Sequence, residues 1–116
     1  MIRSILAVSV AALALSGTAL ASPAAAHATT VKVAAKDYSF ALSAKKVKTG
    51  RITFVIRNTG SAVHDFAIAG HQSKTIGPGK TTRLTVTFKK PGRFHYSCTV
   101  DSHAELGMKG TLRVVS

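Results

Sequence analysis

Short segments of alternating side-chain character follow one another from about residue 30 onward and restrict the chain to β-structure. In the segment 51–57, two Ile and one Phe face one way, while Thr, Val and Arg face the other. Segments 81–88 and 93–98 have the same period of two. This period is typical of half-buried strands, and no segment has the 3.6-residue spacing of an amphipathic helix. The alternation therefore predicts an all-β protein.

Turn-forming residues divide the alternating segments at regular intervals. Asn-Thr-Gly-Ser at 58–61 and Lys-Lys-Pro-Gly at 89–92 are residues that tight turns favour. A Gly-rich loop is expected at 69–80. Further short strands are expected at 31–35, continuing through 37–40 with Tyr38 and Phe40 on one face, and at 46–48, 63–68 and 110–115. About seven to eight strands favour a single-domain β-sandwich or a small barrel.

The only cysteine, Cys98, ends one of these strands, and His103 and Met108 follow it at intervals of five residues. A thiolate, an imidazole and a thioether therefore share one short loop, and such soft and borderline donors suit copper in both oxidation states. A buried, inert cysteine is the alternative reading. Two His, one Cys and a weak axial Met are the ligand set of blue-copper sites, so the loop would supply three of the four.

Strand phase sorts the other histidines. His95 is out of phase with the apolar face of its strand and should point to solvent, whereas His71 lies in a Gly-flanked loop and His27 near the N-terminus. His64 begins a predicted strand, which could hold it rigidly against the Cys98 loop. The candidate metal ligands are therefore His64, Cys98, His103 and Met108. The alternative is that all four are ordinary core or surface residues.

The N-terminus has the features of a secretory signal peptide. Arg3 precedes an apolar run from Ile5 to Ala21, and small residues follow. We expect residues 1–28 to be this signal and residues 29–116 to be the mature copper-binding domain. Cleavage fits after Ala21, Ala26 or Ala28. An uncleaved membrane anchor is the alternative. Export predicts a location in the periplasm, the cell envelope or the extracellular medium.

The chain is strongly basic, with 16 Lys and Arg against 4 Asp and Glu and a formal charge of +12. The basic residues form no dense run and have few aromatic neighbours, so the sequence does not favour nucleic-acid binding. In an exported protein, a basic surface suits an anionic membrane, a wall polymer or an acidic redox partner. A solvated surface without a specific partner is the alternative.

Three stretches resemble the cupredoxin family of type 1 (blue) copper proteins. His64-Asp65-Phe66 is similar to the family's first-ligand strand, 91–98 to the strand that leads into the cysteine ligand, and 107–112 to the exit into the last strand. The resemblance covers about Thr30 to Ser116. It implies a Greek-key β-sandwich holding one type 1 copper ion per chain. It also implies that His64, Cys98 and His103 are equatorial ligands and that Met108 is the weak axial one.

Two positions depart from the family pattern. Asp65 stands where the family usually has Asn after the first His, and Asp101-Ser102 stands where related sequences often have Pro-Gly. We expect the Asp65 N–H to reach the Cys98 sulfur and its carboxylate to accept a hydrogen bond from Thr99. A buried carboxylate near copper should favour Cu(II) and lower the reduction potential.

The resemblance implies a monomeric electron carrier that shuttles single electrons between redox partner proteins. His103 would be the ligand ring nearest the surface, with Ala104 and Leu106 as a small apolar docking patch. The alternative function is a copper carrier or scavenger that delivers the ion to an acceptor protein. An enzyme is not expected, because a dinuclear copper site needs two cysteines and the chain has one.

Overall fold

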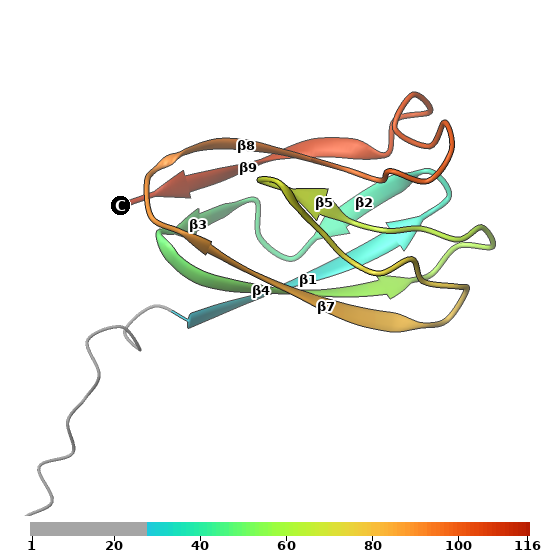
Figure 1. Ribbon diagram of the computed structural model, residues 1–116, viewed down its shortest axis with the longest axis horizontal. Coiled ribbons are helices and arrows are strands. Elements are labelled where there is room, and N and C mark those ends of the chain that lie inside the picture. Colours follow the sequence, from blue (N-terminus) through green and yellow to red (C-terminus); the bar gives the residue numbers. More distant parts are fainter. Residues whose placement is uncertain (1–27) are drawn as a thin grey trace, which may run out of the picture.

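The chain folds as two β-sheets packed face to face, as the alternation predicts (Figure 1). The computed structural model describes residues 28–116. One sheet has the strand order β2-β1-β4-β7 and the other β3-β9-β8-β5-β6. The strands are β1 (Ala28–Lys36), β2 (Ser39–Leu42), β3 (Lys46–Lys48), β4 (Gly50–Asn58), β5 (Ala67–Ile68), β6 (His71–Gln72), β7 (Thr81–Phe88), β8 (Gly92–Ser97) and β9 (Lys109–Val115).

The connectivity confirms the Greek-key sandwich. The chain crosses between the sheets after β2, β3, β4, β6 and β7, so neighbours in sequence repeatedly fall in different layers. β1 runs parallel to β4, and β3 runs parallel to β9, while the other pairs are antiparallel. Nine strands stand against the seven to eight expected, because two of them have only two residues. Within residues 28–116, no helix is long and apolar enough to span a membrane.

The core lies between the sheets and is built from the inward positions of the alternating strands. Ile52, Phe54 and Ile56 of β4 are fully buried, each on the face that the sequence pattern predicts. Phe66 lies at the centre of an aromatic cluster, with its ring centroid 5.0 Å from that of Phe54. It also contacts the rings of Phe40 and Tyr96. Each such side chain contributes about 1.5–3 kcal/mol through burial, which makes the sandwich a rigid frame for its loops.

The expected strand at 37–40 does not continue from β1. The chain turns at Asp37 and Tyr38, and β2 returns antiparallel to β1, with Lys36 opposite Ser39. The Asp37 carboxylate explains this turn, because it accepts hydrogen bonds from the backbone N–H groups of Ser61 and Ala62 in another loop. Tyr38 therefore leaves the face of Phe40 and is 39% exposed.

The segments 63–68 and 69–80 also differ from expectation. His64 makes only an isolated bridge to Ile76, and the strand β5 is confined to Ala67–Ile68. The Phe66 N–H bonds the side chain of Ser73 rather than a neighbouring strand. The expected loop 69–80 contains the strand β6, which pairs with β5 through a tight turn. Side-chain bonds thus replace part of the regular ladder here.

Three connections meet at one end of the sandwich, at the right of Figure 1: the β1–β2 turn, the β4–β5 segment and the β8–β9 loop. The opposite end holds β3, the beginning of β1 and the C-terminus. Because β8 ends in the segment that carries Cys98, the candidate ligands lie at the first of these ends.

Candidate metal centre

The loop from Cys98 to Met108 closes on itself through backbone hydrogen bonds. The Cys98 N–H donates to the Met108 carbonyl at 3.0 Å, and the Met108 N–H donates to the His103 carbonyl at 3.1 Å. The His103 N–H in turn donates to the Val100 carbonyl. Gly107 has φ of 111°, a backbone conformation that other residues rarely adopt. The three candidate ligands of this loop are therefore held together by the backbone itself.

His64 reaches the loop from the β4–β5 segment, where Asn58 fixes the backbone. His64 and Ile76 exchange two backbone hydrogen bonds, of 3.1 and 2.8 Å. The fully buried Asn58 amide donates to the carbonyls of Ala62 and Ile76, at 2.8 Å each, and accepts from the Gly60 N–H. The sequence identified Asn58 only as a turn residue. Its structural role depends on contacts across 18 residues of sequence, which no local pattern indicates.

The donor atoms of His64, Cys98 and His103 lie within 4.0 Å of one another inside the protein. The Nδ1 atoms of the two histidines are 3.2 Å apart, and the Cys98 Sγ lies 4.0 Å from the first and 3.6 Å from the second. A point equidistant from three atoms at these separations lies about 2.1 Å from each, which matches the usual nitrogen bond to a first-row divalent ion and is about 0.2 Å shorter than the usual thiolate bond. Two imidazoles and a thiolate therefore fit one such ion.

Asp37 orients the first histidine and was not identified from the sequence. Its Oδ1 lies 2.6 Å from the His64 Nε2, which directs the His64 Nδ1 lone pair toward Cys98 and His103. The Ser61 N–H is the main cause that lowers the pKa of Asp37, and the His64 ring adds to it. Asp37 is therefore ionised at neutral pH. The sequence offered one indication of a role for Asp37: the chain has only four Asp and Glu residues.

Asp65 forms hydrogen bonds with Thr99, the residue that follows the cysteine, as expected. Its buried carboxylate accepts hydrogen bonds from both the backbone N–H and the hydroxyl of Thr99, and from the amide of Gln72. Burial raises the pKa of the Cys98 thiol, while the backbone N–H groups of Asp65 and Val100 act in the opposite direction. Both N–H groups therefore favour the thiolate, which is the form that binds metals.

Exposed apolar side chains surround this end of the molecule. Within residues 28–116, the exposed large hydrophobic residues are Tyr38, Val63 and Leu106. The Tyr38 ring covers His103, with centroids 4.7 Å apart. His103 is 8% exposed and His64 is fully buried, so His103 is the nearer of the two to the surface. Tyr38 was expected on the same face as Phe40, and its place over the candidate site depends on the Asp37 turn.

The remaining candidates also have definite places. Met108 is fully buried beside Cys98 and His103. His95 is exposed and hydrogen-bonded to the Thr111 hydroxyl, as strand phase predicts, and His71 is exposed on β6.

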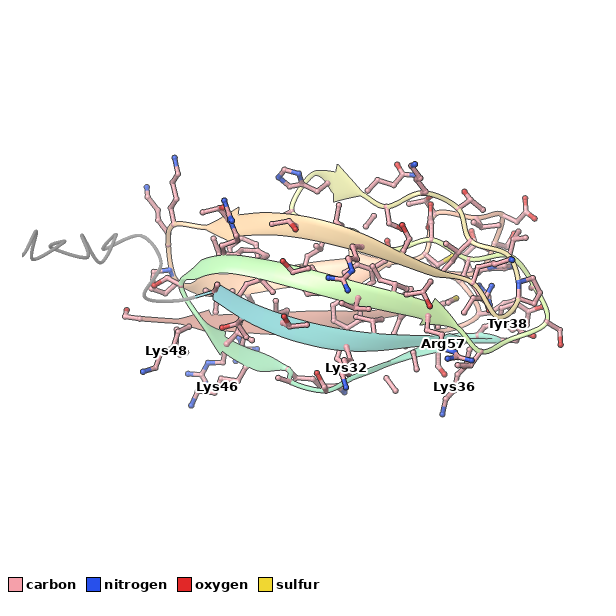
Figure 2. All side chains as sticks on the ribbon, turned by 90° about the horizontal axis from the view of Figure 1, so that it is seen from below. Lys32, Lys36, Tyr38, Lys46, Lys48 and Arg57 are labelled. Carbon is pink, nitrogen blue, oxygen red and sulfur yellow. The ribbon has the colours of Figure 1, made fainter. Side chains whose placement is uncertain are left out.

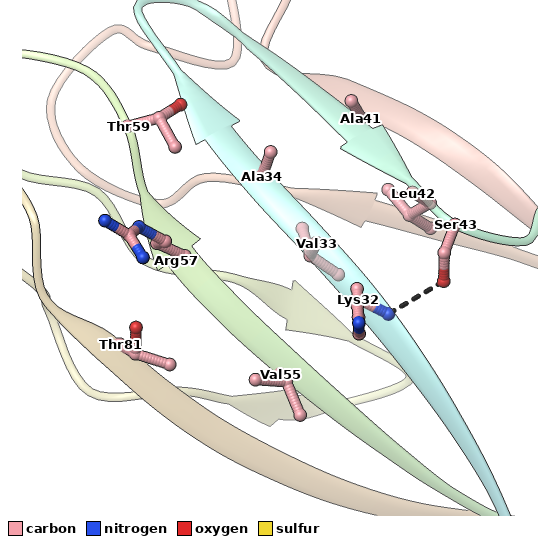
Figure 3. Close-up of a pocket in the computed structure, with 10 residues that line it drawn as sticks. All are labelled: Lys32, Val33, Ala34, Ala41, Leu42, Ser43, Val55, Arg57, Thr59 and Thr81. Carbon is pink, nitrogen blue, oxygen red and sulfur yellow. Dashed lines mark hydrogen bonds between the residues drawn. The ribbon is translucent and has the colours of Figure 1, made fainter.

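A groove of about 560 Å³ lies on the outer face of β1, β2 and β4, beside Lys32 and Arg57 (Figure 3). No candidate ligand lines it, so it is separate from the metal centre.

A family comparison agrees with this geometry. The model of the cupredoxin-like domain matches residues 5–114, nearly the whole chain. The chain belongs to the cupredoxin-like family. The match begins at residue 5, ahead of Thr30, where the sequence resemblance begins. Family and donor set together confirm the cofactor expected for this cupredoxin, one type 1 copper ion per chain.

Solved structures of auracyanins share the fold. Dithionite-reduced auracyanin from the photosynthetic bacterium Roseiflexus castenholzii is 22% identical, with a TM-score of 0.63, and the match covers 76% of this chain and 97% of that one. Auracyanin B is 18% identical, with a TM-score of 0.66 and coverage of 78% and 91%.

Auracyanin A, a "blue" copper protein from the green thermophilic bacterium Chloroflexus aurantiacus, is also 18% identical, with a TM-score of 0.61 and coverage of 75% and 98%. At these identities the likeness supports the cupredoxin fold. No curated protein matches the chain.

Proposed function

We propose that this cupredoxin is an exported, monomeric carrier of single electrons, with residues 1–28 as its signal peptide. His64 and His103 would hold copper through Nδ1 and Cys98 through Sγ, with Met108 as a fourth and weaker ligand. The observation that carries the proposal is the meeting of two imidazoles and one thiolate from two separate segments at a single buried point. Residues 1–27 lie outside the described structure, and Ala28, one possible cleavage point, already pairs with Arg51.

The protein groups act by holding the ligands still. Bound copper supplies a one-electron couple between Cu(I) and Cu(II). Asp37 fixes the His64 ring, and the closed loop fixes Cys98, His103 and Met108. Because all four side chains are buried, water is excluded from them. A frame that resists rearrangement favours fast electron transfer, since the two oxidation states prefer different geometries.

The apolar rim suits docking of a redox partner protein. Tyr38, Val63 and Leu106 place exposed apolar surface around His103, the less deeply buried histidine. Such side chains form the central contacts of protein interfaces, whereas charged residues favour the rim. Electrons would leave through His103 and the Tyr38 ring that covers it.

The test is the visible spectrum and voltammetry of the copper-loaded protein. We expect an intense blue band from Cys98-to-Cu(II) charge transfer and a reversible one-electron couple. Cys98→Ala and His64→Ala should each abolish the band. His95→Ala, which changes an exposed histidine on the same sheet, should keep it. A wild-type protein without the band would refute the ligand set.

Copper retention separates this function from copper delivery. Burial of all four side chains supports an ion that is kept during redox cycling. We expect the ion to remain bound when a copper-accepting protein is added in excess. Transfer of copper to that acceptor, together with an irreversible voltammogram, would favour a carrier instead.

A further inference from the structure

A row of three positive charges crosses the outer face of the five-stranded sheet. Strand register places Arg113 of β9 directly opposite Lys46 of β3 on one side and Arg93 of β8 on the other. All three side chains are exposed. Cβ atoms of directly opposite residues are roughly 5 Å apart, and like charges in such pairs destabilise a sheet. We call Lys46, Arg93 and Arg113 the cationic row.

No side-chain carboxylate within residues 28–116 forms an ion pair with the cationic row. The only ion pair within residues 28–116 joins Asp37 to His64, at the copper end. The other side-chain carboxylates also belong to that end: Asp65 bonds Thr99 next to Cys98, and Asp101 and Glu105 lie in the ligand loop. Figure 2 shows Lys46 and Lys48 at the opposite end of the sandwich from Tyr38, which covers His103.

More exposed cations surround the cationic row and form what we call the basic end. Its members are Lys45, Lys46, Lys48, Arg51, Lys89, Lys90, Arg93 and Arg113. An open groove of about 410 Å³ lies beside Arg93 and Arg113. A negatively charged ligand would relieve the repulsion within the row.

The basic end lacks the apolar anchors that a protein partner would use. The exposed large hydrophobic residues of the described chain are all near the copper ligands instead. A cationic surface without such anchors suits a partner that binds through charge alone, such as anionic phospholipid headgroups.

We propose that the basic end binds an anionic lipid bilayer through the cationic row and thereby turns the copper end away from the membrane. The bound state leaves Tyr38, Val63 and Leu106 free to meet a partner protein. The proposal goes beyond electron transfer, because it concerns a surface that shares no residue with the copper ligands.

Co-sedimentation with vesicles tests the proposal. The secreted, copper-loaded protein, with its N-terminus checked by mass spectrometry, is mixed with phosphatidylcholine vesicles that contain or lack phosphatidylglycerol. We expect binding only to the anionic vesicles, and loss of binding in high salt. Each basic residue near such a surface accounts for about fivefold in affinity, so the variant Lys46→Gln/Arg93→Gln/Arg113→Gln should bind about a hundredfold more weakly.

A variant with the same loss of charge at the copper end is the matched control. Lys36, Arg57 and Lys80 are exposed, and Figure 2 shows Lys36 and Arg57 near Tyr38. Lys36→Gln/Arg57→Gln/Lys80→Gln should bind nearly as well as the wild type. Equal weakening in the two triple variants would overturn the assignment of the face.

Binding to soluble polyphosphate without binding to anionic vesicles would overturn the choice of lipid. The far-UV spectrum checks that each variant is folded. The blue band is recorded separately, so a failure of vesicle binding is distinguishable from a failure of the proposed copper function.

Discussion

The two ends of this cupredoxin differ in how their charges are arranged. At the copper end, Asp37 and Asp65 accept two or more hydrogen bonds each and hold particular groups in place. At the basic end, Arg113 stands between two other cations, and no ion pair within residues 28–116 involves it. The carboxylates at the copper end hold neighbouring side chains and backbone groups in place. The cations at the basic end are instead available to an external anion.

The difference shows that the high net positive charge is unevenly distributed over the molecule. The fold collects every side-chain carboxylate of the chain at the copper end, although the four are spread between residues 37 and 105 of the sequence. That end also carries the exposed apolar residues. Under the two proposals, a partner protein and an anionic membrane would bind at opposite ends without competition.

Removal of the Asn58 amide should have the largest effect and should act on the copper end alone. Asn58→Ala leaves the buried carbonyl of Ile76 and the Gly60 N–H without their side-chain partner. We expect the free energy of unfolding to fall by about 2–4 kcal/mol, measured by denaturant titration of the metal-free protein. Thr59→Ala, which removes only a weak bond on an exposed residue, should change it by less than about 0.5 kcal/mol. Similar losses in both variants would contradict this role of Asn58.

Neutralisation of Asp37 should shift the copper potential. Asp37→Asn keeps an oxygen for the His64 ring but removes the negative charge behind it. Less negative charge near copper favours Cu(I), so voltammetry should show a rise of tens of millivolts, where about 60 mV corresponds to 1.4 kcal/mol. Asp101→Asn makes the same charge change on an exposed loop residue and should shift the potential less. Equal shifts of the reduction potential in the two variants would mean that the contact between Asp37 and His64 has no specific effect on the potential.

Removal of the middle charge of the cationic row should have the smallest effect and the opposite sign. Arg113→Gln relieves repulsion from both neighbours, so we expect the free energy of unfolding to rise by about 0.5 kcal/mol in low salt. The gain should disappear near 1 M salt, where the screening length is about 3 Å. Arg51→Gln is the control, because Arg51 lies opposite Ala28 and Thr87. A gain of equal size there would assign the effect to net charge rather than to the row.

Local sequence patterns were enough to predict the β-class, the inward faces and the direction of several side chains. Cys98 and Tyr96 point inward and His95 outward, as a period of two requires. The spacing of Cys98, His103 and Met108 indicated a copper loop, and strand phase selected His64 as the fourth candidate. The structure brings the donors of His64, Cys98 and His103 together, and their role as ligands stays a prediction.

Asp37 and Tyr38 escaped the sequence analysis because their roles arise between distant segments. A single alternating pattern extends plausibly through 37–40, yet the chain turns there, and the Asp37 carboxylate accepts a hydrogen bond from the Ser61 N–H, 24 residues away. That turn places the carboxylate on His64 and the Tyr38 ring over His103.

By itself, the sequence determined which faces the side chains of β4, β7 and β8 take, because alternation is a local property of the backbone. It also determined that three candidate copper donors share a loop. Only the tertiary structure decided which strands are neighbours and in what register, because pairing depends on packing between segments far apart in the chain. Register brought Lys46, Arg93 and Arg113 into one row, and the meeting of three loops assembled the metal centre at the other end.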